Sequence, residues 1–269
     1  MTATFLERLA ARSAATGTTL CLGLDPEPAA LPEGFSSDVV GLERFAALVL
    51  EAALPYATAV KPNLAFYEAL GSPGIAALER LRAAIPSDVP VIMDAKRADI
   101  GTTAARQAVA LFDTLGADAV TVNPYLGEAA IEPLLERLDR FAFVVCRTSN
   151  PGASEIQDIP VAADGDAPAE RLHERVARRV ATWGPGGTVG IVVGATGPAE
   201  MAGLRATVPG LAFLVPGLGA QGGDIDAVRT SGPAQAGPVA SRRWHAGWAD
   251  AASSAHPPAP LACGTVRRE

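Results

Sequence analysis

The sequence predicts an α/β protein with the (β/α)8 TIM-barrel architecture, and three observations lead to this prediction. The chain has 269 residues, of which 49% are hydrophobic, and a single barrel usually takes roughly 250 residues. Short apolar segments without polar alternation recur along it, as is typical of parallel strands covered on both faces. Helix-like segments separate them, and this alternation indicates repeated βαβ units.

The expected elements follow one another in regular order from the N-terminus. Seven apolar segments are predicted as strands: residues 19–24, 57–60, 89–93, 117–122, 141–146, 188–193 and 211–215. Seven further segments are predicted as helices: residues 5–15, 39–53, 74–84, 102–115, 128–137, 167–182 and 198–207. Residues 159–168 contain two prolines and a glycine, and they are predicted as a long loop.

The residues that directly follow the strands favour a closed barrel over an open doubly wound sheet. A polar residue or a glycine stands at these positions: Asp25, Lys61, Asp94, Asn123, Arg147, Gly194 and Gly217. In a barrel the carboxyl ends of all strands converge on one mouth, where the active site lies, whereas an open sheet would arrange them along a line. We therefore expect these residues to surround a common site.

The C-terminal segment breaks this pattern. Residues 1–226 are predicted to form the barrel body, and residues 227–269 are an atypical segment expected to complete the barrel within a single domain. This segment shows no apolar strand followed by a clean helix, and the prolines of residues 255–262 exclude a helix interior. The last βα unit is therefore expected to be irregular or degraded. The sequence leaves open whether the segment is native-like, diverged or frame-shifted.

The composition excludes several classes of protein. The net charge is −7, which argues against a nucleic-acid partner, because no basic stripe is available to neutralise phosphates. The three cysteines, Cys21, Cys146 and Cys263, indicate neither a disulfide framework nor a zinc site. Cys21 and Cys146 stand in apolar runs and are predicted to be buried thiols. Neither a signal peptide nor an apolar run long enough for a membrane span is found, so we expect a cytoplasmic protein with no membrane partner.

The segment with the richest chemistry is residues 91–103, where an apolar strand ends in charged residues. Asp94 and Lys96 lie two positions apart, so on a strand they point the same way, and each keeps the other ionised. By itself this pair is better explained by a salt bridge that merely caps the barrel. Asp99 and Lys61 extend it to a four-charge cluster, which is costly to bury and seldom kept for stability alone.

Several segments resemble the orotidine 5′-phosphate decarboxylase family. Residues 94–100, Asp-Ala-Lys-Arg-Ala-Asp-Ile, are similar to its Asp-x-Lys-x-x-Asp-Ile motif, which the hexulose-phosphate synthases and keto-gulonate-phosphate decarboxylases share in shorter form. Other segments are similar to the motifs of the first, second, fourth, fifth and seventh strands: residues 22–26, 60–68, 123–127, 147–153 and 216–223. The resemblance covers residues 13–226 and points to the longer bacterial subgroup.

The resemblance implies roles for the charged residues. Lys61, Asp94, Lys96 and Asp99 correspond to the catalytic tetrad of the family, and Asp99 would reach into the neighbouring subunit's site. Lys96 would be the proton donor at C6 of the pyrimidine ring. An ammonium group held there would also stabilise the negative charge that develops when CO2 leaves.

The resemblance also implies which residues bind the substrate. Asp25 and Lys61 correspond to ribose contacts, Thr103 to a ribose contact made across a dimer, and Ser149 to the hydroxyl that reads the pyrimidine edge. The remaining candidates are Pro216 in the seventh-strand motif and, for phosphate, Gln221 and Arg242, with Arg243 equally possible. The glycine-rich turns at residues 194–198 and 217–223 provide backbone amides for a phosphate group.

These correspondences imply a carboxy-lyase that converts orotidine 5′-phosphate (OMP) to UMP and CO2 in pyrimidine nucleotide synthesis. They imply no cofactor, no metal and a homodimer. One alternative is a magnesium-dependent sister barrel acting on a sugar phosphate, against which Ser149 and residues 150–153 argue. The other is an inactive nucleotide-binding copy, which the C-terminal segment favours and the intact tetrad opposes.

Two residues outside the motifs also receive an interpretation. Asp158 stands close to the predicted loop at 159–168 and is interpreted as part of a lid. His173 lies in a charged helical segment and is expected at the solvated surface.

Overall fold

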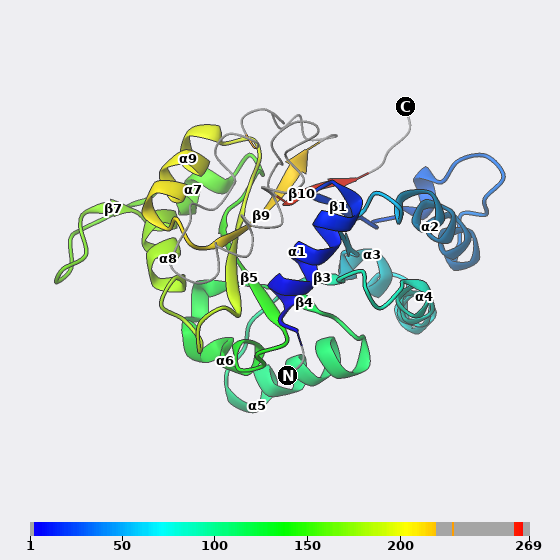
Figure 1. The fold of residues 1–269 in the computed structure, drawn as a ribbon, viewed down its shortest axis with the longest axis horizontal. Helices are drawn as coiled ribbons and strands as arrows, with labels where there is room; N and C mark the ends of the chain where they lie inside the picture. The colour runs from blue at the N-terminus through cyan, green and yellow to red at the C-terminus, as the bar shows by residue number, and fades with distance from the viewer. Residues whose placement is uncertain (1–2, 219–227, 229–260, 266–269) are drawn as a thin grey trace.

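Eight parallel strands form the centre of the protein (Figure 1). The computed structural model describes residues 3–218, residue 228 and the backbone of residues 261–265. The strands are β1 (Leu20–Gly23), β2 (Ala59–Lys61), β3 (Ile92–Arg97), β4 (Ala119–Val122), β5 (Phe141–Arg147), β8 (Val189–Val193), β9 (Ala212–Leu218) and β10 (Leu261–Thr265). They lie in the order β2-β1-β10-β9-β8-β5-β4-β3, and each neighbouring pair is parallel.

The two ends of this order meet, so the sheet closes into a barrel. β2 and β3 are joined by two parallel bridges, Val60 with Val91 and Asn63 with Asp94. Their backbones are linked by a 2.9 Å hydrogen bond from the amide of Asp94 to the carbonyl of Pro62. The predicted (β/α)8 architecture is confirmed, and the carboxyl ends of the strands share one mouth.

Strand β10 corrects one statement of the sequence analysis. No strand is recognisable after Asp226 in the sequence, yet the backbone of Leu261–Thr265 pairs with β1 on one side and β9 on the other. The segment Leu-Ala-Cys-Gly-Thr is short and rich in small residues, so it carries a weak strand pattern. The neighbouring strands β1 and β9 of the barrel provide its pairing, and tertiary context of this kind overrides local strand propensity.

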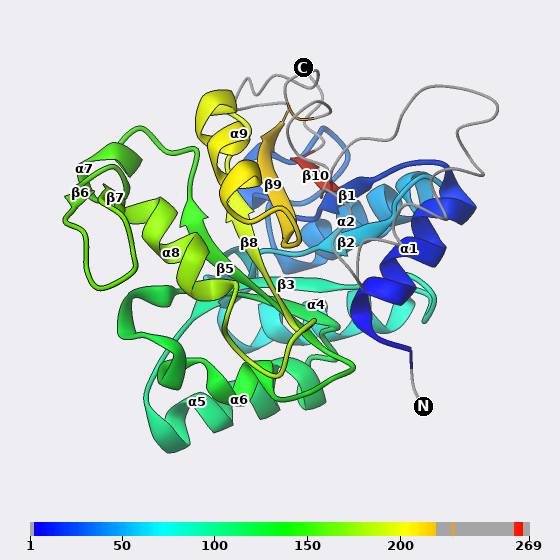
Figure 2. The same cartoon turned by 60° about the vertical axis from the view of Figure 1, so that its left-hand side comes forward.

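Helices cover the outside of the barrel (Figures 1 and 2). They are α2 (Val39–Ala53), α3 (Leu64–Glu68), α4 (Gly71–Ala84), α5 (Gly101–Ala108), α6 (Glu132–Leu135), α7 (Ala153–Gln157), α8 (Leu172–Val180) and α9 (Pro198–Thr207). The start of α2 shows the local chemistry that sets such boundaries. The Asp38 carboxylate accepts hydrogen bonds from the amides of Val40 and Gly41 (3.0 and 2.9 Å), which have no partner inside the helix.

Several predicted elements differ from the structure in their bounds. The helix expected at 102–115 is α5 followed by a π-helical turn, Val109–Thr114, and the helix expected at 128–137 is a 3-10 turn followed by the short α6. The predicted loop at 159–168 contains a hairpin strand, β6 (Pro160–Val161), which pairs with β7 (Glu170–Arg171) and projects from the barrel (Figure 2). Helix α8 therefore begins only at Leu172, where the Glu174 carboxylate accepts the Arg171 amide at 2.7 Å.

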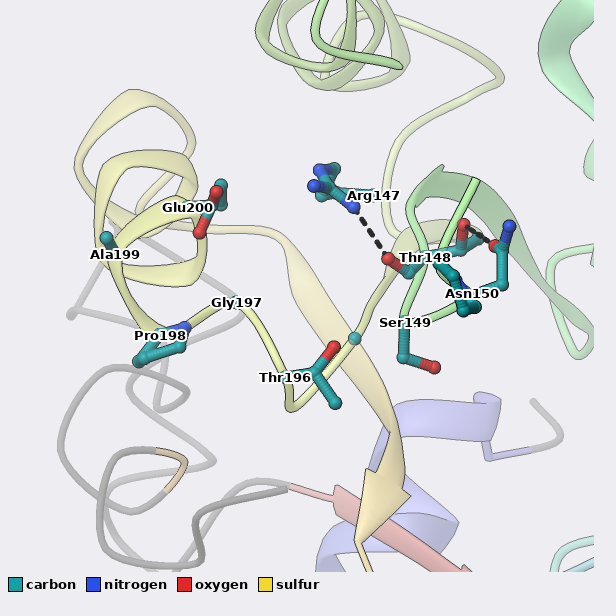
Figure 3. Close-up of a pocket in the computed structure, with 11 residues that line it drawn as sticks. Arg147, Thr148, Ser149, Asn150, Thr196, Gly197, Pro198, Ala199 and Glu200 are labelled. Atoms are coloured by element: carbon teal, nitrogen blue, oxygen red, sulfur yellow. Dashed lines mark hydrogen bonds between the residues drawn. The ribbon is translucent and has the colours of Figure 1, made fainter. Parts of the chain in front are cut away.

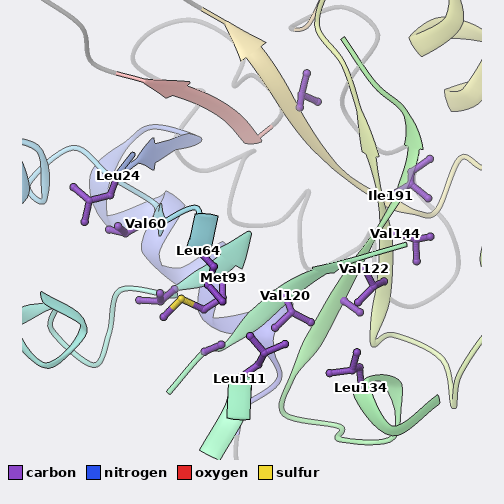
Figure 4. Close-up of a cluster of buried hydrophobic side chains, with 14 of the residues drawn as sticks. Leu24, Val60, Leu64, Met93, Leu111, Val120, Val122, Leu134, Val144 and Ile191 are labelled. Atoms are coloured by element: carbon purple, nitrogen blue, oxygen red, sulfur yellow. The ribbon is translucent and has the colours of Figure 1, made fainter. Parts of the chain in front are cut away.

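Apolar side chains fill two layers, one on each side of the strands. The outer layer packs strands against helices and includes Val60, Met93, Val120, Val122, Val144 and Ile191 (Figure 4). The inner layer holds alternate residues of the same strands, namely Cys21, Ala59, Ile92, Ala119, Phe141, Phe143, Val192 and Leu214. Successive side chains of a strand point to opposite faces, so each strand contributes residues to both layers. Cys21 and Cys146 are buried, as predicted.

Helix α1 (Phe5–Thr16) closes the end of the barrel opposite the mouth. Phe5 stacks on Phe141 with ring centroids 5.1 Å apart and belongs to the inner layer together with Leu9. Arg8 binds the buried Asp118 carboxylate at 2.8 Å, just before β4 begins. Ring packing and a partly buried ion pair thus fix α1 across the amino ends of the strands.

Phe5→Ala should lower the free energy of unfolding by about 3–5 kcal/mol, because it leaves a cavity in the inner layer. Urea denaturation of the variant and the native protein measures the difference. Leu138→Ala is the matched control, since Leu138 is exposed and its truncation opens no cavity. Equal losses in the two variants would contradict the assignment of Phe5 to the closed end of the barrel.

Candidate functional site

Backbone hydrogen bonds tie the strand ends together around the mouth. The amide of Leu24 donates to Lys61 O (3.1 Å) between β1 and β2, and the amide of Asn123 donates to Arg97 O (3.0 Å) between β3 and β4. On the other side, Gly194 donates to Arg147 O (2.7 Å) and Ala195 to Pro216 O (2.9 Å). The polar positions that the sequence places after the strands therefore do surround one rim.

The centre of this rim is the Asp94 carboxylate, near the end of β3. Its Oδ2 accepts from Lys61 Nζ of β2 at 2.8 Å, and its Oδ1 accepts from Lys96 Nζ at 2.6 Å. Oδ1 also accepts from the Thr121 hydroxyl of β4 at 2.7 Å. The predicted contact between Asp94 and both lysines is present, and Thr121 is an additional partner that the sequence analysis missed.

Burial and charge act in opposite directions on these groups. Burial on its own would raise the pKa of Asp94, but the ammonium groups of Lys61 and Lys96 outweigh it and hold that pKa well below its ordinary value. At Asp25 burial dominates and raises the pKa, although Lys61 and a hydrogen bond from the amide of Asn63 (2.9 Å) pull it down. Asp94 therefore stays ionised, and Asp25 is the more easily protonated carboxyl of the rim.

The two lysines have different environments although they share one carboxylate. The Lys61 side chain is 6% exposed and the Lys96 side chain is 50% exposed. They are also the only lysines in the sequence, since every other residue among its 22 basic residues is an arginine. An ammonium group can give up a proton, whereas a guanidinium does not do so in proteins. The rim thus holds one nearly buried ammonium group and one that is half exposed.

The backbone at Lys96 is unusual. Its φ is +47°, and Lys96 is the one non-glycine residue in the left-handed region within the described part of the chain. Such a residue costs about 1–3 kcal/mol and persists only where its surroundings hold it in place. The register between β3 and β4 also shifts between Met93 and Arg97, so residues 94–96 form a bulge. A bulge of this kind re-aims the side chains that it carries.

The other predicted residues of this side lie close by. The Asp99 carboxylate accepts the amide of Ile100 at 2.8 Å and, within the described residues, forms no ion pair with Lys61 or Lys96. Thr103 is exposed near the start of α5. Both are at the rim without contacting the Lys–Asp–Lys cluster of their own chain.

Ser149 lines a pocket between the ends of β5 and β8 (Figure 3). The pocket is lined by residues 147–151, Gly194 and residues 196–200. A Cβ at Gly194 would come within 2.7 Å of the Ser149 amide nitrogen, so the close approach of the two turns requires glycine. Pro216 is half-buried in β9, whereas Gln221, Arg242 and Arg243 lie outside the described residues.

An ion pair between Arg147 and Asp158 fixes the segment that follows Ser149. The Arg147 guanidinium donates from Nε and from one terminal nitrogen to the two carboxylate oxygens of Asp158, both at 3.0 Å. His173 Nδ1 lies 3.1 Å from the same carboxylate, and the His173 side chain is buried. The expected surface position of His173 is therefore wrong. Asp158 and His173 are separated by 14 residues in the sequence. The β6–β7 hairpin brings them together, and no local pattern reveals it.

The described residues contain neither a candidate metal-binding cluster nor a candidate membrane-spanning helix. No group of three or more His, Cys, Asp or Glu side chains within them is arranged to hold a metal ion. No helix within them is long and apolar enough to cross a membrane.

The barrel with a lysine-rich rim belongs to a known class. Residues 18–240 match the model of the Orotidine 5'-phosphate decarboxylase / HUMPS family, and the chain belongs to this family. The orotidine 5'-phosphate decarboxylase of Herpetosiphon aurantiacus is 45% identical over 232 residues, covering 86% of this chain and 85% of the relative. The matched segment ends before Arg242 and Arg243.

Solved structures agree with this membership. The Leishmania donovani OMP decarboxylase has a TM-score of 0.75 and 36% identity, covering 86% of this chain and 84% of that one. The Leishmania donovani UMP synthase has a TM-score of 0.77 and 39% identity, and the match spans 86% of this chain but only 48% of that longer chain.

Asp94→Asn should cost about 3–5 kcal/mol of stability at pH 7, because it removes the charge that compensates the buried Lys61. The pKa of Asp94 is lowered in the folded state, so the carboxylate contributes stability above its unfolded pKa of about 3.9. That contribution is lost as the pH falls through the lower folded pKa. The gap between native protein and variant should therefore shrink below about pH 4. Urea unfolding from pH 7 to pH 3 measures it, and a constant gap would contradict the lowered pKa.

Proposed function

We propose that this protein is an orotidine 5′-phosphate decarboxylase, a carboxy-lyase that converts OMP to UMP and CO2. The observation that carries the proposal is the Lys61–Asp94–Lys96 cluster at the barrel mouth, in which both ammonium groups lie within 2.8 Å of one carboxylate. The matches to proteins named as this enzyme support the same activity. The expected cytoplasmic location stays a prediction.

Lys96 is proposed as the proton donor. Cleavage of the bond between C6 and the carboxyl carbon releases CO2 and leaves the electron pair on C6. The Lys96 ammonium stabilises this charge while it develops and then transfers a proton from Nζ to C6, which yields UMP. Lys96 is half exposed and therefore regains its proton from water. Asp94 fixes the ammonium at 2.6 Å and lies beside the departing carboxylate.

The substrate would lie across the mouth with its parts assigned to separate groups of residues. Asp25 and Lys61 would hold the ribose hydroxyls on the β1–β2 side, and Ser149 would read the pyrimidine edge beside β5. The amides of the turn after β8 would receive the phosphate, as anions prefer the N-terminus of a helix such as α9. The second glycine-rich segment, residues 217–223, lies mostly outside the described residues. Pro216, Gln221 and Arg242 complete the proposed phosphate side, and the choice between Arg242 and Arg243 stays open.

A direct assay separates this proposal from its alternatives. Loss of orotate absorbance on mixing the protein with OMP, unchanged by EDTA, is the expected result. EDTA-sensitive turnover of a hexulose phosphate instead would indicate the magnesium-dependent sister barrel. Tight UMP binding without turnover of OMP would indicate the inactive copy.

Lys96→Ala and Lys96→Arg should each lower kcat by about 10²–10⁴-fold, the usual contribution of a positioned general acid. The arginine variant tests proton donation in particular, because it keeps the charge and cannot release the proton. Arg80→Ala, which removes a surface ion pair with Glu43, is the control and should keep full activity. Near-native turnover by Lys96→Arg would exclude Lys96 as the donor.

The scarcity of lysine permits an independent test in the native protein. With only Lys61 and Lys96 present in the chain, an amine acetylating reagent should modify the half-exposed Lys96 faster than the buried Lys61. UMP at saturation should protect Lys96. Peptide mapping by mass spectrometry measures both rates, and equal labelling of Lys96 with and without UMP would place the nucleotide elsewhere.

A homodimer is proposed from the surface next to Asp99 and Thr103. Ile100 is 72% exposed and Tyr125 is 85% exposed, and Leu126 beside Tyr125 is exposed as well. The hydrogen bond from the amide of Asp99 to Ala130 O (3.2 Å) brings the two segments together. Exposed apolar residues near Asp99 and Thr103 fit an interface through which these two residues would enter the partner's site.

Ile100→Asp combined with Tyr125→Ser should convert the dimer into a monomer and remove most of the activity, because Asp99 and Thr103 would no longer reach a partner's site. Sedimentation velocity and the OMP assay measure the two effects. Leu138→Asp, which changes an exposed apolar residue before β5 at the closed end of the barrel, should remain dimeric and active. A fully active monomer of the native protein would refute the shared site.

A further inference from the structure

We infer that Thr121 is a positioning residue for the reaction, because its hydroxyl holds the bulge that aims Lys96 at the substrate. The inference rests on the proposed function, in which Lys96 donates the proton. Thr121 lies in β4, is 1% exposed and is not one of the charged residues that the sequence points to.

The Thr121 hydroxyl uses its full hydrogen-bonding capacity on one short segment of β3. It accepts the amides of Ala95 and Lys96, each at 3.0 Å. It lies 2.7 Å from Asp94 Oδ1. A hydroxyl has one proton and two lone pairs, so with two amides on the lone pairs the proton is directed at the carboxylate. Three consecutive residues of the bulge are thereby attached to one oxygen atom.

This arrangement explains how the bulge exists. Two successive amides that point at one acceptor require the backbone to leave the regular ladder, and the register with β4 shifts at this place. Lys96 accordingly adopts its left-handed φ of +47°. Without the hydroxyl, the amides of Ala95 and Lys96 lose their acceptor in a part-buried position, and the strained backbone loses its restraint.

The position of Thr121 also follows from the barrel. Ala119 of β4 and Phe143 of β5 belong to the inner layer, and Thr121 stands two residues after Ala119 and directly opposite Phe143 in the ladder. It therefore faces the interior at the level just below the mouth. A valine would fill the same space, so the hydroxyl is explained by its hydrogen bonds and not by packing.

Thr121→Val should lower kcat about 10- to 100-fold, the effect expected when a reacting group is misplaced by a fraction of an ångström to 1 Å. KM should change little, because the variant keeps the residues proposed to contact ribose, pyrimidine and phosphate. Thr121→Ser restores the hydroxyl and should recover most of kcat. A rise in KM with kcat unchanged, or a serine variant as slow as the valine variant, would overturn the inference.

Thr188→Val is the matched control. Thr188 is as buried as Thr121, but it precedes β8 at the closed end, and its hydroxyl has no hydrogen-bond partner within the described residues. The same change of a hydroxyl to a methyl group should leave kcat and KM unchanged there. A loss of kcat in this control equal to that of Thr121→Val would show that barrel stability, and not the bulge, limits the rate.

Hydrogen exchange provides a readout that does not depend on turnover. The peptide containing the amides of Ala95 and Lys96 should exchange faster in Thr121→Val than in the native protein and Thr121→Ser. If the native protein failed to turn over OMP, the proposed function would fall while the exchange result still decided whether Thr121 holds the bulge. Unchanged exchange in a folded Thr121→Val variant would refute the claim that Thr121 holds the bulge. If that variant does not fold, the kcat of Thr121→Ser decides.

Discussion

The site depends on keeping one carboxylate ionised inside a barrel mouth. A buried charge is stable only when it is paired and hydrogen-bonded, and Asp94 meets this condition with donors from three neighbouring strands. Lys61 comes from β2, Lys96 from β3 itself and Thr121 from β4. Since each donor is carried by a different part of the rim, the charge balance exists only when these strands lie in their observed register. Fold and site are therefore maintained by the same contacts.

The two lysines have different roles, which a single ammonium group could not combine. Lys61 is buried and compensates Asp94, which allows the carboxylate to stay charged. Lys96 is half exposed and carries the left-handed backbone conformation, so it is held in a strained position from which its ammonium is accessible. Strain of this kind is stored where a rigid scaffold can hold it, and the barrel together with the Thr121 hydroxyl provides that scaffold.

The part of the mouth at the ends of β5 and β8 is organised by neutral turns and a separate ion pair. Gly194 packs against the Ser149 backbone, and Arg147 attaches the following segment through Asp158. His173 joins the same carboxylate from α8. This side therefore has its own fixed geometry, independent of the Lys–Asp–Lys cluster. A ligand that spans the mouth meets two preformed halves, and little of its binding energy is needed to organise them.

Most of the architecture could be read from the sequence, because apolar periodicity and turn residues are local signals. They predicted the first seven barrel strands, most of the long helices and the meeting of Lys61, Asp94 and Lys96 at one rim. Strand β10 was not predicted, because Leu261–Thr265 carries only a weak strand pattern and depends on its pairing with β1 and β9. The sequence did not predict the burial of His173, the bulge at residues 94–96 or the role of Thr121, and the reason is related. Each depends on hydrogen bonds between groups far apart in the chain, and the closure of the barrel decides those distances.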